Sequence, residues 1–222
     1  MCLKALSEPN LIATGTFNDI KILNIATEEE KKFIAHDNAW IRDLTQNLIG
    51  EIISCAQDSF IKIWDFAKFS ETELLPIAKK VLKGHTGPIF CLKIINKCIL
   101  ASGSEDTIIK LWDMGLGVCV ISLSGHTSWV KGLDLTNDGR LISCSLDKTI
   151  KIWNLETGDV VTTLHGHSEK VLSIKYYQND KIISGDYRGD IKIWDLKSGL
   201  CIKTMNENLN SKENQIFNLN IF

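Results

Sequence analysis

The chain has 222 residues, of which 44% are hydrophobic and 23% charged, so it is long enough to bury a core and its composition excludes a mainly disordered protein. Its 25 Lys and Arg are balanced by 27 Asp and Glu, which disfavours a nucleic-acid binder because such domains usually carry a basic excess. The sequence contains no run of 18 apolar residues that could span a bilayer. Its start, MCLKALSEPN, lacks the features of a secretory signal. We therefore expect an intracellular, cytoplasmic protein without membrane association.

A segment of similar sequence recurs five times along the chain. In chain order the copies read LIATGTFNDIKILN, IISCAQDSFIKIWD, LASGSEDTIIKLWD, LISCSLDKTIKIWN and IISGDYRGDIKIWD, with Leu23, Trp64, Trp112, Trp153 and Trp194 at the same place. The intervals 64 − 23, 153 − 112 and 194 − 153 all equal 41, whereas 112 − 64 equals 48. The extra seven residues fit a longer connection in residues 66–80. A fixed period of this length indicates a repeat architecture.

Within one copy, alternating apolar and polar residues between turn residues predict four short strands. In the fourth copy the predicted strands cover residues 130–135, 141–143, 150–153 and 160–164, and a turn at 137–139 separates the first two. No stretch of useful length has a helical period. Four strands per repeat of about 40 residues is the pattern of a propeller blade. We therefore predict an all-β fold, a β-propeller of four-stranded antiparallel blades.

A His precedes each copy that carries Trp, and in the last three it forms a Gly-His pair at Gly84-His85, Gly125-His126 and Gly166-His167. Gly-His, the Ser-x-Ser-x-Asp turn and Trp-Asp thus recur at matching intervals. In these features the chain resembles the WD-repeat family of β-propellers, and the resemblance covers nearly the whole sequence.

The spacing places the blades along one predicted domain, residues 1–222. We expect blades at about 1–35, 36–83, 84–124, 125–165 and 166–206, with residues 214–222 as the first strand of a further blade. The resemblance implies seven blades, which would need about 287 residues at this spacing. An incomplete seven-bladed ring, a closed five-bladed ring, a truncated gene product and completion by a second chain all stay open. Open blade edges would favour self-association.

Polar residues recur at fixed positions in the copies. The set comprises His36, Ser54, Asp58 and Trp64; His85, Ser102, Asp106 and Trp112; His126, Ser143, Asp147 and Trp153; and His167, Ser184 and Trp194. A catalytic Ser-His-Asp triad is one interpretation. Catalysis needs one site, however, and this set is repeated, so we favour the structural hydrogen-bond network that the resemblance implies. Arg188 stands at the Asp position of the last copy and the Leu23 copy lacks His and Trp, so we expect these two blades to be held less firmly.

No CxxC pair occurs among the seven cysteines, and their odd number leaves at least one outside any intrachain disulfide. We therefore expect reduced thiols, no metal site and no cofactor. No polar cluster unique to one copy is left for catalysis, and the recurring strand lysines Lys62, Lys110, Lys151 and Lys192 suggest solvated faces rather than a nucleic-acid site.

The remaining feature is the composition of the surface. It favours the function of a non-enzymatic protein-protein interaction scaffold. The resemblance implies that residues after each His and before each turn Asp face the central channel: Trp40, Arg42, Gln57, Phe90, Glu105, Trp129, Lys131, Leu146, Lys170 and Tyr187. Exposed Trp, Tyr and Arg often anchor interfaces. Trp40 and Trp129 share one repeat position, and we expect them to form one patch with Arg42 and Lys131 that binds a peptide or protein. The alternative functions are a structural segment of a larger assembly, a truncated propeller without independent binding, a propeller enzyme and a nucleic-acid binder.

Overall fold

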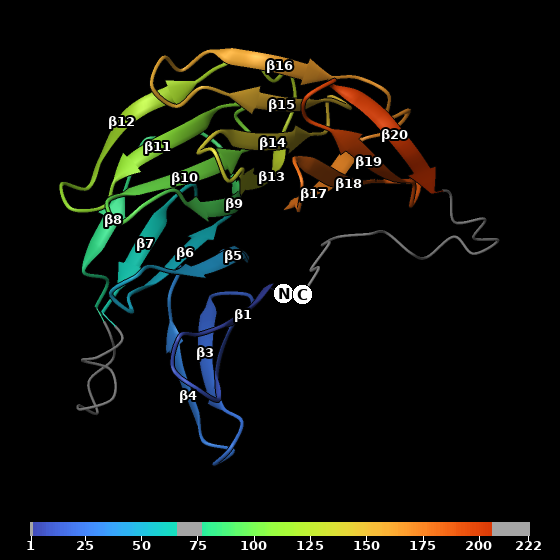
Figure 1. Ribbon diagram of the computed structural model, residues 1–222. Helices are drawn as coiled ribbons and strands as arrows, with labels where there is room; N and C mark the ends of the chain where they lie inside the picture. The colour runs from blue at the N-terminus through green and yellow to red at the C-terminus, as the bar shows by residue number, and fades with distance from the viewer. Residues whose placement is uncertain (1, 66–76, 206–222) are drawn as a thin grey trace. The chain divides into compact units, whose positions relative to one another are not determined.

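The computed structural model describes residues 2–65 and 77–205 (Figure 1). The predicted strand at residues 214–222 and most of the long connection after Trp64 lie outside these residues. Within them the secondary structure consists of strands and turns without helices, and the strands form five four-stranded antiparallel sheets. This architecture confirms the prediction of an all-β protein with four-stranded antiparallel blades.

Each sheet contains four strands that are neighbours in the chain, as the colour sequence in Figure 1 shows. The first sheet contains β1 (Cys2–Ala5), β2 (Leu11–Gly15), β3 (Asp19–Asn24) and β4 (Glu30–Ile34). The second contains β5 (Ile41–Gln46), β6 (Ile52–Ala56), β7 (Ile61–Trp64) and β8 (Lys80–Leu82). The third contains β9 (Ile89–Ile94), β10 (Ile99–Ser104), β11 (Ile109–Asp113) and β12 (Val118–Leu123). The fourth contains β13 (Val130–Leu135), β14 (Leu141–Ser145), β15 (Ile150–Trp153) and β16 (Val160–Leu164), and the fifth β17 (Val171–Tyr177), β18 (Lys181–Asp186), β19 (Ile191–Asp195) and β20 (Leu200–Met205).

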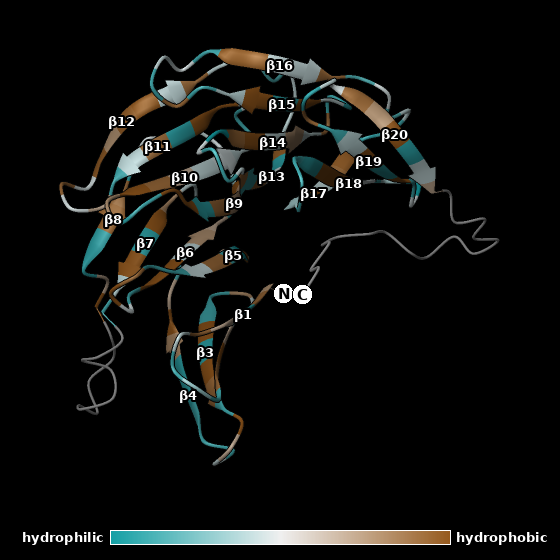
Figure 2. Cartoon of the chain, in the orientation of Figure 1, coloured by the Kyte–Doolittle hydropathy of each residue, from teal (hydrophilic) through white to brown (hydrophobic). Residues whose placement is uncertain are grey.

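Burial differs between the inner and outer strands of a sheet for a reason visible in the sequence. The second strands β6 and β14 are buried along their whole length, and their residues are mainly apolar or small. The outermost strand β12 alternates instead, so that Val118 and Val120 are exposed while Leu123 is buried. Figure 2 shows this strand as largely hydrophobic, which places apolar side chains at the outer edge of the sheet.

The chain divides into two compact units. The first comprises Met1–Asp106 and Lys110–Val120, and the second Thr107–Ile109 and Ile121–Phe222. In the first unit β5 contacts β1 and β2, and β9 contacts β5 and β6; in the second unit β17 contacts β13 and β14. Within each unit, the first strand of a later sheet therefore packs against the first two strands of the sheet before it.

The turn between the second and third strands has one backbone conformation in all five sheets. The residue five positions before each Trp, or before Leu23, has a positive φ; these residues are Asn18 (68°), Ser59 (67°), Thr107 (73°), Lys148 (71°) and Gly189 (92°). Only Gly189 adopts this conformation without a Cβ penalty. In the second, third and fourth sheets this residue directly follows the Asp of the repeating set, so the turn fixes where that carboxylate lies.

Candidate functional site

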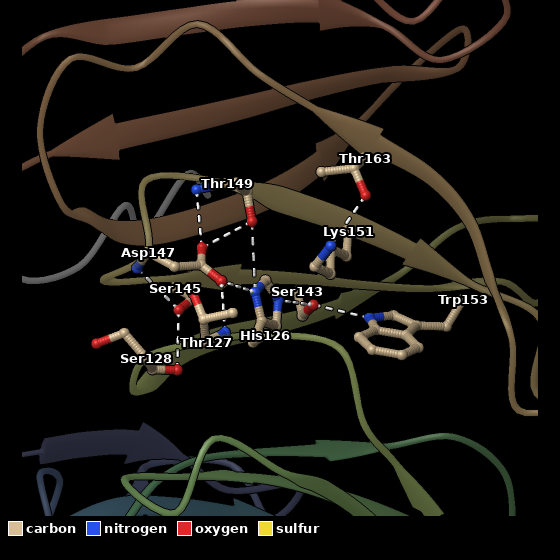
Figure 3. Close-up of polar contacts among 10 residues, drawn as sticks. All are labelled: His126, Thr127, Ser128, Ser143, Ser145, Asp147, Thr149, Lys151, Trp153 and Thr163. Carbon is tan, nitrogen blue, oxygen red and sulfur yellow. Dashed lines mark hydrogen bonds and ion pairs between the residues drawn. The ribbon is translucent and has the colours of Figure 1, made fainter.

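The repeating His, Ser, Asp and Trp residues form a chain of hydrogen bonds in the fourth sheet (Figure 3). Trp153 Nε1 donates to Ser143 Oγ at 2.8 Å, and Ser143 Oγ lies 2.7 Å from His126 Nε2. The other ring nitrogen, His126 Nδ1, lies 2.7 Å from Asp147 Oδ2. Because a carboxylate only accepts, Nδ1–H donates to Asp147. With that tautomer of the neutral imidazole, Nε2 accepts from the Ser143 hydroxyl, which itself accepts from the indole.

Asp147 is the most densely bonded member of this network. Its Oδ2 also accepts from the Thr127 amide at 3.0 Å, and its Oδ1 accepts from the Thr149 amide at 2.9 Å and from Thr149 Oγ1 at 2.7 Å. Burial alone would raise the pKa of Asp147, but the hydrogen bonds from His126 and Thr149 hold that pKa well below its usual range. The carboxylate thus connects the end of β14 to the segment that precedes β13.

The second and third sheets contain the same network. The corresponding distances, in the order Trp to Ser, Ser to His and His to Asp, are 2.9, 2.8 and 2.7 Å for Trp64, Ser54, His36 and Asp58. They are 2.8, 2.8 and 2.7 Å for Trp112, Ser102, His85 and Asp106. Burial would raise the pKa of Asp58, but the hydrogen bond from His36, the bond from the Phe60 amide and nearby positive charge together outweigh it, so this pKa is also lowered. The near-identical distances show that one local geometry is repeated.

The fifth sheet has a complete network, which the sequence analysis did not foresee. His167 Nδ1 lies 2.9 Å from Asp186 Oδ2, while Ser184 and Trp194 occupy the expected places. Asp186 stands two residues before the repeat position of the turn Asp, and Arg188, which holds that position, is exposed and pairs with Glu169 at 3.3 Å. The expectation of a weakened blade assumed that Arg188 leaves the network without its Asp. That assumption is wrong, because the side chain of Asp186, two residues before Arg188, reaches His167.

We expect Asp186→Ala to destabilise the protein and Arg188→Ala to leave it nearly unchanged. Asp186 is fully buried, and its loss would leave His167 without an acceptor for Nδ1–H, at a cost of about 1 to 3 kcal/mol. Arg188 makes one exposed ion pair, which is worth less than about 1 kcal/mol. Urea unfolding of both variants measures the difference. A larger loss for Arg188→Ala than for Asp186→Ala would contradict this assignment.

A Ser-His-Asp set can act as a catalytic triad only if the serine can reach a substrate. Ser54, Ser102, Ser143 and Ser184 are all fully buried, and each hydroxyl already contacts both an indole and an imidazole. In this arrangement the serine Oγ, which would have to attack a substrate carbonyl, instead accepts a hydrogen bond from the indole inside the sheet. The geometry therefore favours a structural network over nucleophilic catalysis.

The predicted channel-face residues lie at one end of their sheets, where backbone bonds bring them together in pairs. The Gln57 amide donates to the Trp40 carbonyl at 3.1 Å, Leu146 to Trp129 at 3.0 Å, and Tyr187 to Lys170 at 2.9 Å. In the third sheet Glu105 donates to Pro88, two residues before Phe90, at 2.8 Å. In each sheet, this backbone hydrogen bond thus links the turn between the second and third strands to the residues at the start of the first strand.

In the first unit these residues take part in two contacts, one between two aromatic rings and one between a cation and a ring. The rings of Phe17 and Trp40 meet edge to face with centroids 5.5 Å apart, and both side chains are exposed, by 44% and 45%. Arg42, two residues after Trp40 and also exposed, lies 5.9 Å from the ring centroid of the half-buried Phe90. We call Phe17, Trp40, Arg42 and Phe90 the aromatic cluster. Sequence reasoning missed Phe17, although it stands at the turn Asp position of the Leu23 copy.

In the second unit, Trp129 and Tyr187 are exposed by 40% and 48%, Lys170 is exposed, and Lys131 and Leu146 are half-buried. Trp129 and Lys131 belong to this unit, whereas Trp40 and Arg42 belong to the first. The expectation that these four residues form one patch stays a prediction.

Within residues 2–65 and 77–205, no group of three or more His, Cys, Asp or Glu side chains is arranged as a metal site. Over the same residues no helix is long and apolar enough to cross a membrane.

Comparison with known families finds four matches to "WD domain, G-beta repeat", at residues 27–65, 77–113, 117–154 and 158–195. Together they cover more than half of the chain. Each match starts just before the outermost strand of one sheet and ends at the third strand of the next, so four matched repeats correspond to five sheets. This offset explains why β1 to β3 lie outside the matches.

Three curated proteins illustrate the relationship. Over 120 residues, 53% of this chain and 18% of the relative, the sequence is 32% identical to Protein tipD of Dictyostelium discoideum. It is 55% identical over 38 residues, 17% of this chain and 6% of the relative, to the probable E3 ubiquitin ligase complex SCF subunit sconB of Talaromyces marneffei. It is 30% identical over 121 residues, 46% of this chain and 25% of the relative, to nuclear distribution protein nudF 2 of Penicillium rubens.

The chain spans a quarter or less of the length of these relatives. The family assignment rests instead on the four matched repeats and on the network that recurs in their sheets. The chain belongs to the WD domain, G-beta repeat family.

Proposed function

We propose that this protein is a non-enzymatic scaffold that binds a protein or peptide through the aromatic cluster of its first unit. WD repeats imply a protein-interaction role, and one similar protein is named as a subunit of a multi-protein complex. The repeated polar set is buried inside the sheets, which leaves the exposed ends of the sheets for recognition.

The observation that carries this proposal is the composition of the aromatic cluster. Trp40 and Phe17 present two large rings at the surface, and Arg42, two residues after Trp40, adds a cation near the ring of Phe90. Aromatic residues and arginine dominate the binding energy of many interfaces because they combine large contact area with a polar or charged group. The register of the β5–β6 pairing shifts between Ile41 and Asp43, the interval that contains Arg42. Trp40 forms an isolated β-bridge with Phe17, which holds these two residues side by side.

We expect Trp40→Ala to weaken partner binding by at least about 2 kcal/mol, or roughly 30-fold in affinity, without unfolding the protein. A partner captured with the wild-type chain would be titrated against Trp40→Ala by calorimetry, with thermal melts to show that the variant is folded. Ile49→Ala is the matched control, because Ile49 is also exposed and apolar but lies beyond the other end of β5.

Equal affinities for wild type and Trp40→Ala would exclude the aromatic cluster as the binding site. A loss with Ile49→Ala instead would move the site to the loop between β5 and β6. Trp129→Ala, measured in the same way, tests whether the second unit takes part in binding the same partner.

A further inference from the structure

Two turns of the first unit expose large apolar side chains. Leu48 and Ile49, in the turn between β5 and β6, are 71% and 77% exposed, and Leu116, in the turn between β11 and β12, is 75% exposed. Both turns lie at the end of their sheets opposite to the aromatic cluster. We call residues 47–50 and 114–117 the apolar turns. Side chains with this exposure add little to the core, so the core does not explain why they are apolar.

The fold does not require apolar residues in the first of these turns. The turn between β13 and β14 in the fourth sheet has the same backbone conformation. Gly50 and Gly139 have φ values of 87° and 83°, and in both turns the glycine amide donates to the carbonyl three residues earlier at 3.1 Å. The residues at the tip of the fourth-sheet turn are nevertheless Asn137 and Asp138. Polar residues therefore support the same turn.

The second apolar turn also has polar equivalents. Gly117 has a φ of 77°, and the glycines at the same repeat position in the fourth and fifth sheets have φ values of 79° and 70°. In all three turns this glycine amide donates to the carbonyl four residues earlier at 2.8 or 2.9 Å. The position of Leu116 is held there by Thr157 and Ser198. Exposed apolar residues that the fold does not need are typical of an interaction surface.

Polar contacts connect the two apolar turns across the second and third sheets. Glu51, directly after the first turn, forms an ion pair with Lys79. Lys80, the first residue of β8, donates from Nζ to the Met114 carbonyl in the second turn at 2.9 Å. The Met114 amide donates to the carbonyl of Cys98, the residue before β10, at 2.8 Å. These contacts hold the apolar turns and the turn between β9 and β10 at one end of the two sheets.

The exposed charges around the apolar turns are positive. Lys79 is exposed, and so is Lys97 in the turn between β9 and β10. Glu51 is buried, and the half-buried Asp113 accepts from the Leu116 amide at 2.8 Å. Among the described residues of these turns, no acidic side chain is exposed. A protein surface that places acidic groups beside apolar ones would therefore complement this one.

The backbone of the apolar turns favours a helix over a strand as the occupant. The amides of Gly50 and Gly117 already donate within their own turns, so the surface offers side chains rather than the free edge of a strand. An amphipathic helix satisfies its own backbone and binds through its side chains. Its apolar stripe can cover the apolar turns while acidic residues beside that stripe pair with Lys97.

Two other occupants fit this surface less well. A second copy of the chain that used the same surface would bring lysines against lysines, which is unfavourable. A lipid surface takes up Trp and Tyr at its interface and attracts each cation by about 1 kcal/mol. The described part of this surface instead presents aliphatic side chains and two exposed lysines, Lys79 and Lys97.

We propose that the apolar turns bind an acidic amphipathic helix of a protein partner. Leu48, Ile49 and Leu116 pack against its apolar stripe, and Lys97 pairs with its acidic residues. This inference does not depend on the proposed function, because the aromatic cluster lies at the opposite end of the same sheets. For the same reason Ile49→Ala stays a valid control for the partner of that cluster.

The probe is a displayed library of peptides of about 20 residues, long enough for a helix of several turns. Leucine is fixed at helical spacing, and the other positions carry Glu, Lys, Gln or Ser. The full chain selects from this library, and the enriched peptides are titrated at low and at high salt. We expect acidic peptides to be enriched and their affinity to fall as the salt concentration rises.

The matched variant gives the first apolar turn the residues of its fourth-sheet equivalent, as Leu48→Asn with Ile49→Asp. The same backbone holds Asn137 and Asp138 in the fourth sheet, so we expect the double variant to fold, and thermal melts check this. The enriched peptides should bind it at least about tenfold more weakly than wild type. Trp40→Ala should bind them with wild-type affinity.

A second variant separates apolar contact from charge. Leu116→Thr introduces the residue of the fourth sheet without adding a charge, and it should weaken peptide binding about fivefold. No enrichment of acidic peptides, or equal affinity of wild type and the double variant, would overturn the proposal. So would binding to vesicles of phosphatidylserine and phosphatidylcholine in place of the peptides, or a concentration-dependent rise in mass that the double variant abolishes, because a lipid surface or a second copy would then be the occupant.

Discussion

Asp147→Ala is expected to lower the free energy of unfolding by about 3 kcal/mol. The substitution leaves His126 Nδ1–H, the Thr127 amide and the Thr149 amide without their acceptor at a site where the carboxylate is almost fully buried. Urea unfolding followed by tryptophan fluorescence measures the loss. Because the folded-state pKa of Asp147 is lowered, its contribution is present above about pH 4 and is lost as the pH falls further.

The matched control is Asp138→Ala in the same sheet. Asp138 is also an aspartate in a turn, but it is exposed and its main ionic contact is Arg140 at 2.8 Å, so its loss should be below about 1 kcal/mol. If Asp147→Ala and Asp138→Ala unfold at the same urea concentration, the carboxylate of Asp147 does not hold the sheet together.

Asp43→Asn is expected to remove a fall in stability that the wild type shows between about pH 4 and pH 6. Burial raises the pKa of Asp43 to about 6, although its carboxylate accepts bonds from the Leu92 and Leu44 amides. The folded state therefore binds a proton more tightly than the unfolded state, whose carboxyl has a pKa near 3.9. Stability then falls as the pH rises from about 4 to 6, by up to about 3 kcal/mol. Asn keeps one acceptor oxygen for one of these two amides and carries no charge, so the stability of the variant should not fall over this pH range.

Unfolding of wild type and Asp43→Asn at pH 4 and pH 7.5 measures this effect, and the difference between them should shift in favour of the variant at the higher pH. Asp134→Asn serves as the comparison. Asp134 Oδ2 also accepts a backbone amide of the next sheet, from Tyr176 at 2.8 Å, but it lies 3.5 Å from Lys175 Nζ, so neutralising it removes an ion pair. A gain for Asp43→Asn that does not change with pH would show that the buried charge is not its cause.

The strands and the network of the complete copies could be predicted because each depends on residues within one repeat. The alternation around Ile150 and Trp153 fixes which side chains face inward, and the spacing of His126, Ser143 and Asp147 recurs often enough to be recognised. The first sheet also forms without His or Trp, since Ala13, Ile20, Ile22 and Phe33 still supply a buried face.

What the sequence did not predict depends on contacts outside the repeat positions. Asp186 reaches His167 from two residues before the expected place, which alignment of the copies hides. Phe17 and Trp40 come from neighbouring sheets, so their contact depends on how those sheets pack. The surroundings of Asp43 likewise involve β9 of the next sheet. The last two features could not be predicted from the repeat pattern, because their two partners lie in different repeats.

The buried cysteines divide between the two units, and this distribution has a practical use. Cys2, Cys55 and Cys91 lie in the first unit and Cys144 in the second, all buried, and burial raises the pKa of Cys2 to about 12 and that of Cys55 and Cys144 well above its usual value. Only a thiolate reacts quickly with alkylating reagents. In the native protein these buried thiols therefore react slowly until the residues around them open. Their rates of alkylation, measured by mass spectrometry, thus report how often each unit opens.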